Sequence, residues 1–195
     1  MKAHTKAVNE AFRICLAKGL IYRRKGLVRW SPALGSVLSD IEVDQLKIDP
    51  GKQLMEVPSG TALVGQMFDI VYKVEGSDES VTVSTTRPET LIGDVAVAVH
   101  PKDPRYSDLL NRKVLLRHPL RTDLIPLVAD AEGVDPSLGT GAVKITPSVD
   151  VSDFEVAERL SLPSINIIND EGAMTFPSES SFQLTPDGQT FLVSK

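Results

Sequence analysis

The sequence predicts a mostly β domain with flanking helices (α+β), approached through a helical N-terminal arm. Three observations support this fold class. Of the 195 residues, 42% are hydrophobic, which is enough to build a buried core. From Val64 onward, short apolar runs are separated by Gly, Pro and Asp, as in strands joined by turns. Two longer segments instead space their apolar residues by three and four, as amphipathic helices do.

The first of these segments, residues 5–20, predicts a helix that forms the arm. Gly19 stands where a C-terminal cap is expected. Residues 21–45 contain short apolar runs broken by Gly and Pro, which predict short strands and turns. The basic residues between 23 and 29 suit a solvated face, with an RNA-facing edge as the alternative.

Seven later segments predict strands. The first two, "MFDIVYKVEG" and "ESVTVST", alternate apolar and polar residues and so present one apolar face each. The third, "GDVAVAVHP", has small apolar residues on both faces, as in a strand that is covered on both sides. The others are "KVLLRHPL", "LIPLVAD", "GTGAVKITPS" and "SINIIND".

The second helical segment, "DVSDFEVAERLSLP", follows one of these strands. Asp150 or Ser152 is in position to cap the helix. The spacing of Phe154, Ala157 and Leu160 predicts that they face the core.

The corner between that strand and that helix is the first candidate site. Lys144 lies in the middle of an apolar strand, where a lysine rarely stays buried without a partner. On the strand, Thr146 shares its face. Asp150 and Asp153 are three residues apart and so lie on one face of the helix, at its N-terminus. These groups can converge on one pocket, although capping alone also favours Asp in a first helical turn.

The stretch "TTRPET" is the second candidate. Arg87 precedes a proline, which favours extended backbone. Its guanidinium suits a carboxylate or phosphate, and Thr85, Thr86 and Thr90 can line a small polar pocket. The alternative is a Ser/Thr-rich turn in which Arg87 and Glu89 form a surface pair.

Several classes of function are disfavoured. The chain has no nucleotide-binding, zinc-protease or serine-hydrolase signature (GxxxxGK[ST], GxGxxG, HExxH or GxSxG). Its three histidines and Cys15 make no metal-ligand spacing, so no metal is expected. The net charge of −5 argues against a domain that grips phosphate backbones unaided. With a single cysteine and no long apolar stretch, we expect an intracellular protein without a membrane span.

Two blocks of the sequence resemble a known family. "TTRPETLIGDVAVAVHPKDPRY" and "GTGAVKITPSVDVSDFEVAERLSLP" are similar to the signature blocks of the inserted editing domain of the valyl-tRNA synthetases. The segment "AVNEAFRICLAKGLIYRRKGLVRWSPALGSVLSDIEV" is similar to the sequence that leads into that domain. The resemblance implies a helical arm and connecting ribbon over residues 1–45. It also implies a distorted β-barrel editing domain of a class I aminoacyl-tRNA synthetase over residues 46–195.

The resemblance also implies a function. A hydrophobic pocket rejects threonine in favour of valine by only about 10²-fold, for which the valyl enzyme is the standard example, so a second site must correct the errors. This chain would be that editing module, an aminoacyl-tRNA deacylase that hydrolyses the ester of threonyl-tRNA(Val). The implied partners are the acceptor end of tRNA(Val) carrying threonine and the rest of the synthetase in cis, with the isolated domain a monomer. The implied compartment is the cytoplasm or the mitochondrial matrix.

No cofactor is implied for this domain, because ATP and Mg serve the synthetic site of the parent enzyme. The HIGH-like and KMSKS-like signatures of that site do not occur in this chain.

Carried over by motif position, Asp150 holds the substrate ammonium and Asp153 reads the side-chain hydroxyl. Lys144 completes the catalytic group, and water is the implied attacking species. The implied substrate-binding residues are Thr85, Thr86, Arg87, Thr90 and Thr146.

One position departs from the family pattern. The family has a histidine immediately before the first aspartate, in "PAHD", whereas this chain reads "PSVD" with Val149. Two alternatives stay open beside the deacylase. Val149 supports the first, an RNA-docking insertion that has lost editing, and the second is an unrelated β-barrel that binds a small ligand.

Overall fold

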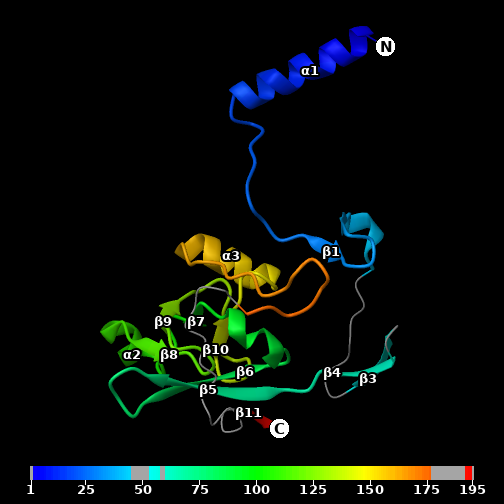
Figure 1. Cartoon of the computed structure of the whole chain (residues 1–195). Helices are drawn as coiled ribbons and strands as arrows, with labels where there is room; N and C mark the ends of the chain where they lie inside the picture. The colour runs from blue at the N-terminus through cyan, green and yellow to red at the C-terminus, as the bar shows by residue number, and fades with distance from the viewer. Residues whose placement is uncertain (1, 45–52, 58–59, 177–191, 195) are drawn as a thin grey trace.

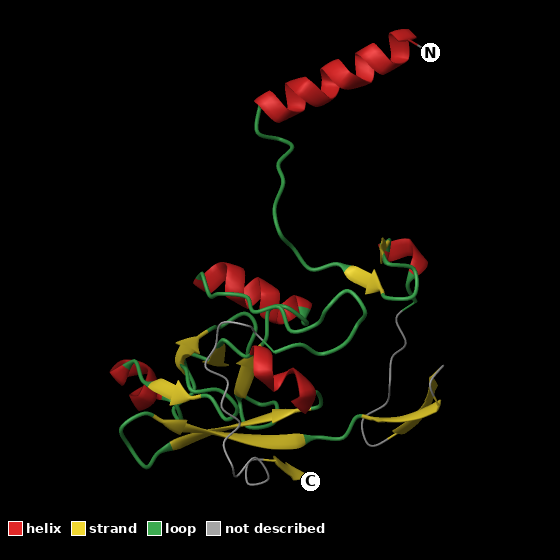
Figure 2. Ribbon diagram, viewed as in Figure 1, coloured by secondary structure: helices red, strands yellow, loops and turns green. Residues whose placement is uncertain are grey.

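A computed structural model describes residues 2–44, 53–57, 60–176 and 192–194 (Figures 1 and 2). The predicted domain boundary at residues 45–46 and most of the tail lie outside these ranges. The helices are α1 (Lys2–Ala17), α2 (Ser107–Arg112) and α3 (Val151–Leu160), with 3₁₀ helices η1 (Asp40–Glu42) and η2 (Pro88–Gly93). The strands are β1 (Arg29–Ser31), β2 (Ser36–Leu38), β3 (Gln53–Val57), β4 (Gly60–Val64), β5 (Phe68–Val74), β6 (Ser80–Thr85), β7 (Ala96–Val99), β8 (Leu115–Arg117), β9 (Leu124–Ala129), β10 (Ala142–Ile145) and β11 (Leu192–Ser194).

A seven-stranded sheet forms the body of the protein. Its order is β10-β7-β9-β8-β5-β11, and β6 pairs with β5. All of its pairs are antiparallel except β7 with β9, which is parallel. Strand β10 also lies against β6, so six of the strands curl into a nearly closed barrel. The prediction of a mostly β fold with flanking helices is confirmed.

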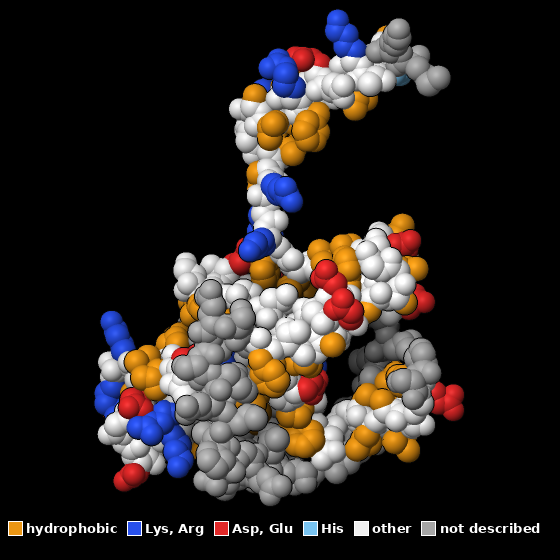
Figure 3. Space-filling view, in the orientation of Figure 1, with side chains coloured by type: hydrophobic (Ala, Val, Ile, Leu, Met, Phe, Trp, Pro, Cys, Tyr) orange, Lys and Arg blue, Asp and Glu red, His pale blue; other side chains and the backbone are white. Residues whose placement is uncertain are grey.

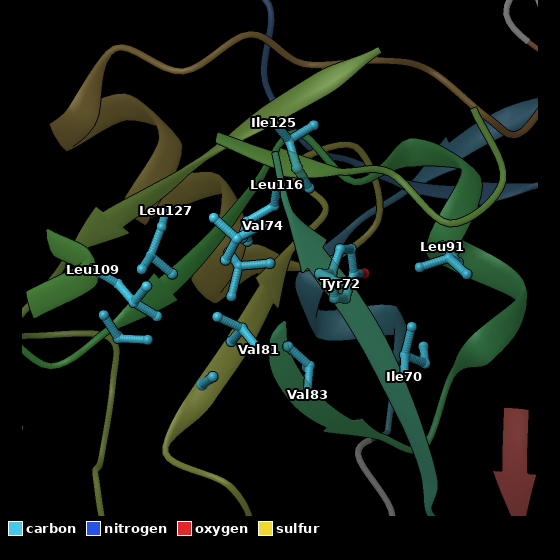
Figure 4. Packing of buried hydrophobic residues seen from close by; sticks show 13 residues of the cluster. Ile70, Tyr72, Val74, Val81, Val83, Leu91, Leu109, Leu116, Ile125 and Leu127 are labelled. Carbon is cyan, nitrogen blue, oxygen red and sulfur yellow. The ribbon is translucent and has the colours of Figure 1, made fainter. Parts of the chain in front are cut away.

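The interior of the barrel holds the larger of two hydrophobic clusters. Alternate residues of β5 and β6 enter it, as the period-2 pattern of their sequences predicted. Strand β7 is buried along its whole length, which matches its small apolar residues on both faces. Figure 4 shows Tyr72 within this cluster, with its hydroxyl oxygen directed toward the side where Leu91 lies.

Helix α3 covers the second cluster with a face that matches its sequence prediction only in part. Val156 and Ala157 are 2% and 4% exposed, whereas Phe154 and Leu160 are only partly buried. The prediction that Phe154 faces the core as Ala157 does was wrong in this detail. Val156, which the sequence pattern did not select, belongs to the same buried cluster as Val95, Ala96 and Ile145, and Leu160 packs against that cluster.

β5 and β6 form a hairpin whose turn includes Gly76. At this glycine φ is +75°, a left-handed conformation that a side chain would strain. Glu75 and Glu79 beside the turn pair with arginines of β8 and α2, which fastens this end of the hairpin to the barrel.

The arm stands apart from the barrel. Helix α1 ends two residues before Gly19, whose φ of +69° confirms its capping role. Hydrophobic side chains are exposed along the helix (Figure 3), with Val8 67% and Phe12 56% exposed. The ribbon β1–β2 then returns to the body, where the Trp30 indole donates to the carbonyl oxygen of Asp170 at 2.7 Å.

Two further features differ from the sequence prediction. Residues 164–170 do not form a strand: Ile167 is fully buried, but the backbone makes only an isolated bridge between Ile168 and Met174. A tight turn at Asn169–Gly172 reverses the chain before a ladder can extend. Helix α2 was not predicted because it has only six residues. No helix in the described part of the chain is long and apolar enough to cross a membrane.

Candidate functional site

A cavity of about 340 Å³ opens at the corner predicted from the sequence. It lies between the end of β6, the start of η2, strand β10 and the N-terminus of α3. All eight side chains that the sequence singled out line it: Thr85, Thr86, Arg87, Thr90, Lys144, Thr146, Asp150 and Asp153. The antiparallel pairing of β10 with β7 brings the two sequence blocks together, with Lys144 opposite Val97.

The floor of the cavity is a buried network around Lys144. Its ammonium donates to Thr90 Oγ1 at 2.7 Å, to Thr146 Oγ1 at 2.5 Å and to Asp94 Oδ1 at 3.1 Å. Lys144 is 7% exposed and Asp94 is fully buried, so the pair places opposite charges side by side in a region of low dielectric. Lys144 therefore has three polar partners although it lies in an otherwise apolar strand.

Asp94 and Tyr72 are site residues that the sequence reasoning missed. Asp94 Oδ2 accepts a hydrogen bond from the Tyr72 hydroxyl at 2.5 Å, and both side chains are fully buried. Burial raises the pKa of Asp94 above its ordinary value, against the opposing effect of Lys144. Burial also raises the pKa of Tyr72, and the neighbouring Asp94 carboxylate adds to that shift. The sequence signal for Asp94 is a charged residue that directly precedes the apolar run "VAVAV".

Two further residues that the sequence did not predict, Arg121 and His118, hold the 3₁₀ helix η2 in place through its backbone carbonyl oxygens. Arg121, with 1% of its side chain exposed, donates to the carbonyl oxygens of Ile92 and Asp94 at 2.5 and 2.7 Å. His118 Nε2 donates to the carbonyl oxygen of Leu91 at 2.8 Å, and its Nδ1 accepts from the backbone N–H of Arg121. Burial, reinforced by the charge of Arg121, lowers the pKa of His118 to about 4, so the ring is neutral at pH 7.

The two carboxylates of α3 occupy the opposite wall. Asp150 Oδ1 accepts from the backbone N–H groups of Ser152 and Asp153 and caps the helix, while its Oδ2 pairs with Arg87. Asp153 Oδ2 accepts from the backbone N–H of Thr146 at 2.8 Å, which ties the helix to β10. Asp150 caps the helix, Asp153 ties it to β10, and both side chains also line the cavity. Their spacing therefore serves the helix N-terminus and also brings both carboxylates to one pocket.

Burial makes the Asp153 carboxyl group a weaker acid than an ordinary aspartate. It raises the pKa of this carboxyl group to about 6, with a further contribution from nearby Asp150. The hydrogen bond from Thr146 and the charge of Lys144 act in the opposite direction. Asp153 is thus an anion at pH 7 that lies close to its protonation point, a property common among groups in functional sites.

Arg87 forms the outer edge of the cavity, with 49% of its side chain exposed. It pairs with Asp150 and not with Glu89, so the surface pair considered from the sequence is not formed. Thr85 Oγ1 accepts from the backbone N–H of Arg87, and Thr90 Oγ1 donates to the Arg87 carbonyl oxygen at 2.9 Å. The "TTRPET" stretch is therefore both a turn and a cavity wall.

Val149 also lines the cavity, next to Asp150. It presents an apolar side chain to a cavity that is otherwise lined mainly by polar groups. Among the described residues, no group of three or more His, Cys, Asp or Glu side chains is arranged to hold a metal ion. The two carboxylates, the hydroxyl groups and the arginine that line the cavity suit recognition of a small polar ligand.

Comparison with known proteins identifies the family. Residues 1–184 match the family model described as tRNA synthetases class I (I, L, M and V). The chain is 50% identical over 168 residues to the valine–tRNA ligase of Takifugu rubripes, an alignment that covers 85% of this chain and 14% of that protein. It is 46% identical over 172 residues to the valine–tRNA ligase of Schizosaccharomyces pombe, covering 87% of this chain and 17% of that protein.

A solved structure is also similar: a chain of the "ternary complex of Agrobacterium radiobacter K84 agnB2 LeuRS-tRNA-LeuAMS". Its TM-score is 0.42 at 22% identity, and the match covers 80% of this chain and 27% of that chain. The present chain thus spans 17% or less of the length of the two valine–tRNA ligases above. Since the family model matches nearly the whole sequence, the chain belongs to the class I tRNA synthetases (I, L, M and V) and is similar to a segment of the valine–tRNA ligases.

Proposed function

We propose that this chain is an editing module that hydrolyses the ester bond of threonyl-tRNA(Val). The observation that carries the proposal is the pair Asp150 and Asp153, one helical turn apart on the wall of a small polar cavity. Threonine attached through its carboxyl group keeps a free ammonium and a side-chain hydroxyl, and each is a hydrogen-bond donor that suits a carboxylate. Valine has nearly the same shape but offers a methyl group in place of the hydroxyl.

The roles proposed for the two carboxylates follow from their surroundings. Asp150 lies near the mouth, with 29% of its side chain exposed and Arg87 beside it, and suits the substrate ammonium. Asp153 lies deeper, keeps one oxygen free of the Thr146 bond, and suits the hydroxyl. If valine enters, Asp153 loses its partner in a desolvated site, at a cost of about 1–3 kcal/mol.

The proposed reaction is attack by water on the ester carbonyl carbon. The tetrahedral intermediate expels the ribose oxygen, which takes up a proton, and threonine and free tRNA are released. Holding the ester and the water together contributes by proximity and orientation. The acceptor end of tRNA(Val) and the rest of the synthetase in cis are the proposed partners, and ATP with Mg belongs to the parent's synthetic site.

The test is single-turnover deacylation of threonyl-tRNA(Val) and valyl-tRNA(Val) by this chain at saturating enzyme. We expect the threonyl ester to be hydrolysed faster. Asp153→Ala should abolish the preference, and Asp150→Ala should weaken binding of both esters. Asp108→Ala, which removes an exposed carboxylate of α2, is the matched control. Wild-type rates in both Asp150 and Asp153 variants would refute the assignment.

A second candidate is a non-catalytic insertion that docks the acceptor end of the tRNA. Val149 favours it, because an apolar side chain at this position can neither orient water nor bind a ribose hydroxyl. Binding of a non-hydrolysable threonyl-adenosine analogue without turnover of threonyl-tRNA would favour this candidate.

A further inference from the structure

The network beneath the cavity uses every hydrogen of the Lys144 ammonium. A lysine ammonium has three hydrogens, and Thr90, Asp94 and Thr146 accept one each. The two hydroxyl groups that accept from Lys144 donate their own hydrogens away from the ammonium. Thr90 donates to the carbonyl oxygen of Arg87, and Thr146 donates to Asp94 Oδ1 at 2.5 Å.

Asp94 is the hub of this network although it does not line the cavity. Its Oδ1 accepts from both Lys144 and Thr146, and its Oδ2 accepts from Tyr72. With no surface exposed, Asp94 cannot exchange these partners for water. Its backbone is fixed as well, because its carbonyl oxygen accepts from the buried Arg121.

We propose that Asp94 is a positioning residue that determines specificity. By accepting hydrogen bonds from Lys144 and Thr146, it keeps the hydrogens of these two side chains from bonding to a ligand in the cavity. The side chains of Lys144, Thr90 and Thr146 then have no hydrogen left for a ligand within the described structure. Such a floor favours ligands whose polar groups donate. The inference rests on the proposed function, since the ammonium and hydroxyl of a threonyl ester are both donors.

The structure indicates what the substitution Asp94→Asn would do. The amide has the shape of the carboxylate but replaces one acceptor oxygen with an N–H donor and removes the charge opposite Lys144. If the amide nitrogen faces the network, a hydrogen of Lys144 or Thr146 loses its acceptor and becomes free to turn toward the cavity. If it faces Tyr72, two donors meet there. Either orientation disturbs the network, and with it the preference for a donor ligand.

The experiment measures binding and the state of Lys144 separately. Binding of non-hydrolysable amide analogues of threonyl-adenosine and valyl-adenosine to the chain is measured by calorimetry. We expect Asp94→Asn to reduce the preference for the threonyl analogue by about tenfold or more. In ¹⁵N-detected NMR of lysine side chains, the wild-type Lys144 ammonium should be protected from exchange, and Asp94→Asn should abolish that protection.

Two further variants control for folding. Asp103→Asn makes the same change at a carboxylate that is 3% exposed, pairs with Arg105 and lies outside the cavity. It should leave the preference and the Lys144 signal unchanged. Tyr72→Phe removes only the bond to Asp94 Oδ2, so it should reduce the preference less than Asp94→Asn does. If Asp94→Asn does not fold, the preference measured for Tyr72→Phe decides whether Asp94 has the proposed role.

The outcomes separate the two proposals. An unprotected Lys144 ammonium in the wild type overturns the positioning role whatever the activity. A preference unchanged in Asp94→Asn, or in Tyr72→Phe if the former does not fold, overturns it too. A wild type that shows no preference, with a protected Lys144, refutes the proposed function and with it the specificity role of Asp94.

Discussion

Replacing Asp153 by Asn should stabilise the protein near neutral pH while it impairs threonine recognition. The pKa of Asp153 is about 6 in the folded protein, against an ordinary value of 3.8, mainly because of burial. The folded state therefore binds more protons than the unfolded state between these pH values. Its stability falls as the pH rises through this window, and the full penalty is present above pH 6.

The size of the effect follows from the same pKa. A pKa of about 6 instead of 3.8 corresponds to about 3 kcal/mol. Asp153 keeps partial contact with solvent, which reduces the expected gain of the Asn variant to about 1–2 kcal/mol at about pH 7.5. The amide oxygen of Asn can still accept from the backbone N–H of Thr146, so the tie between α3 and β10 is kept.

Urea unfolding of the wild type and Asp153→Asn tests this expectation. At about pH 4.5 the advantage of the variant should fall to about a third of its value at about pH 7.5, because the folded wild type is then protonated. Asp103→Asn is the matched control with the opposite sign. Arg105 lowers the pKa of Asp103, so neutralising that carboxylate should destabilise the protein. A variant of Asp153 that is less stable than wild type at about pH 7.5, or whose advantage does not change with pH, would refute the reasoning.

Four other outcomes are expected. Arg121→Lys should destabilise the protein by about 1–3 kcal/mol in urea unfolding and slow deacylation, because one ammonium cannot replace the bonds that hold η2; unchanged stability and rate would contradict this. Val149→His should speed single-turnover deacylation, by up to about 10²–10⁴-fold if the imidazole assists proton transfer; equal rates would remove the idea. Gly141→Ala should lower the melting temperature, because φ is +73° and the added Cβ would lie 2.2 Å from a guanidinium nitrogen; a melting temperature equal to that of wild type would contradict it. Finally, tRNA binding by this chain should be weak and steeply salt-dependent, given its net charge of −5, so a complex that survives physiological salt would be evidence against this view.

The part of the site that the sequence predicted is the part set by local geometry. Asp150 and Asp153 are fixed by helix periodicity, and Lys144 and Thr146 by strand alternation. Arg87 has φ −126° and ψ 67°, outside the helical region, as the proline that follows it favours. For these residues a spacing of a few positions already determines which side chains share a face, so the cavity wall was visible from the sequence.

The supporting residues could not be predicted in this way. Asp94 and Tyr72 meet across 22 positions, and Arg121 reaches the carbonyl oxygen of Ile92 across 29. These contacts depend on strand order and on the closure of the barrel, which no local pattern encodes. The same limit explains the incorrect strand at residues 164–170, where Ile167 is buried by tertiary packing but the backbone makes only an isolated bridge.

The β5–β6 hairpin separates the strand ends that line the cavity from the turn that joins the two strands. Ser84 and Thr85 lie at one end of β6, and the turn precedes the other. Six residues at about 3.3 Å each place roughly 20 Å between them. The exposed Asp78 in that turn is therefore a suitable attachment point for a fluorophore, an affinity tag or an inserted peptide. Since lengthening a surface loop costs little free energy, such an insertion would immobilise or report on the domain without reaching its chemistry.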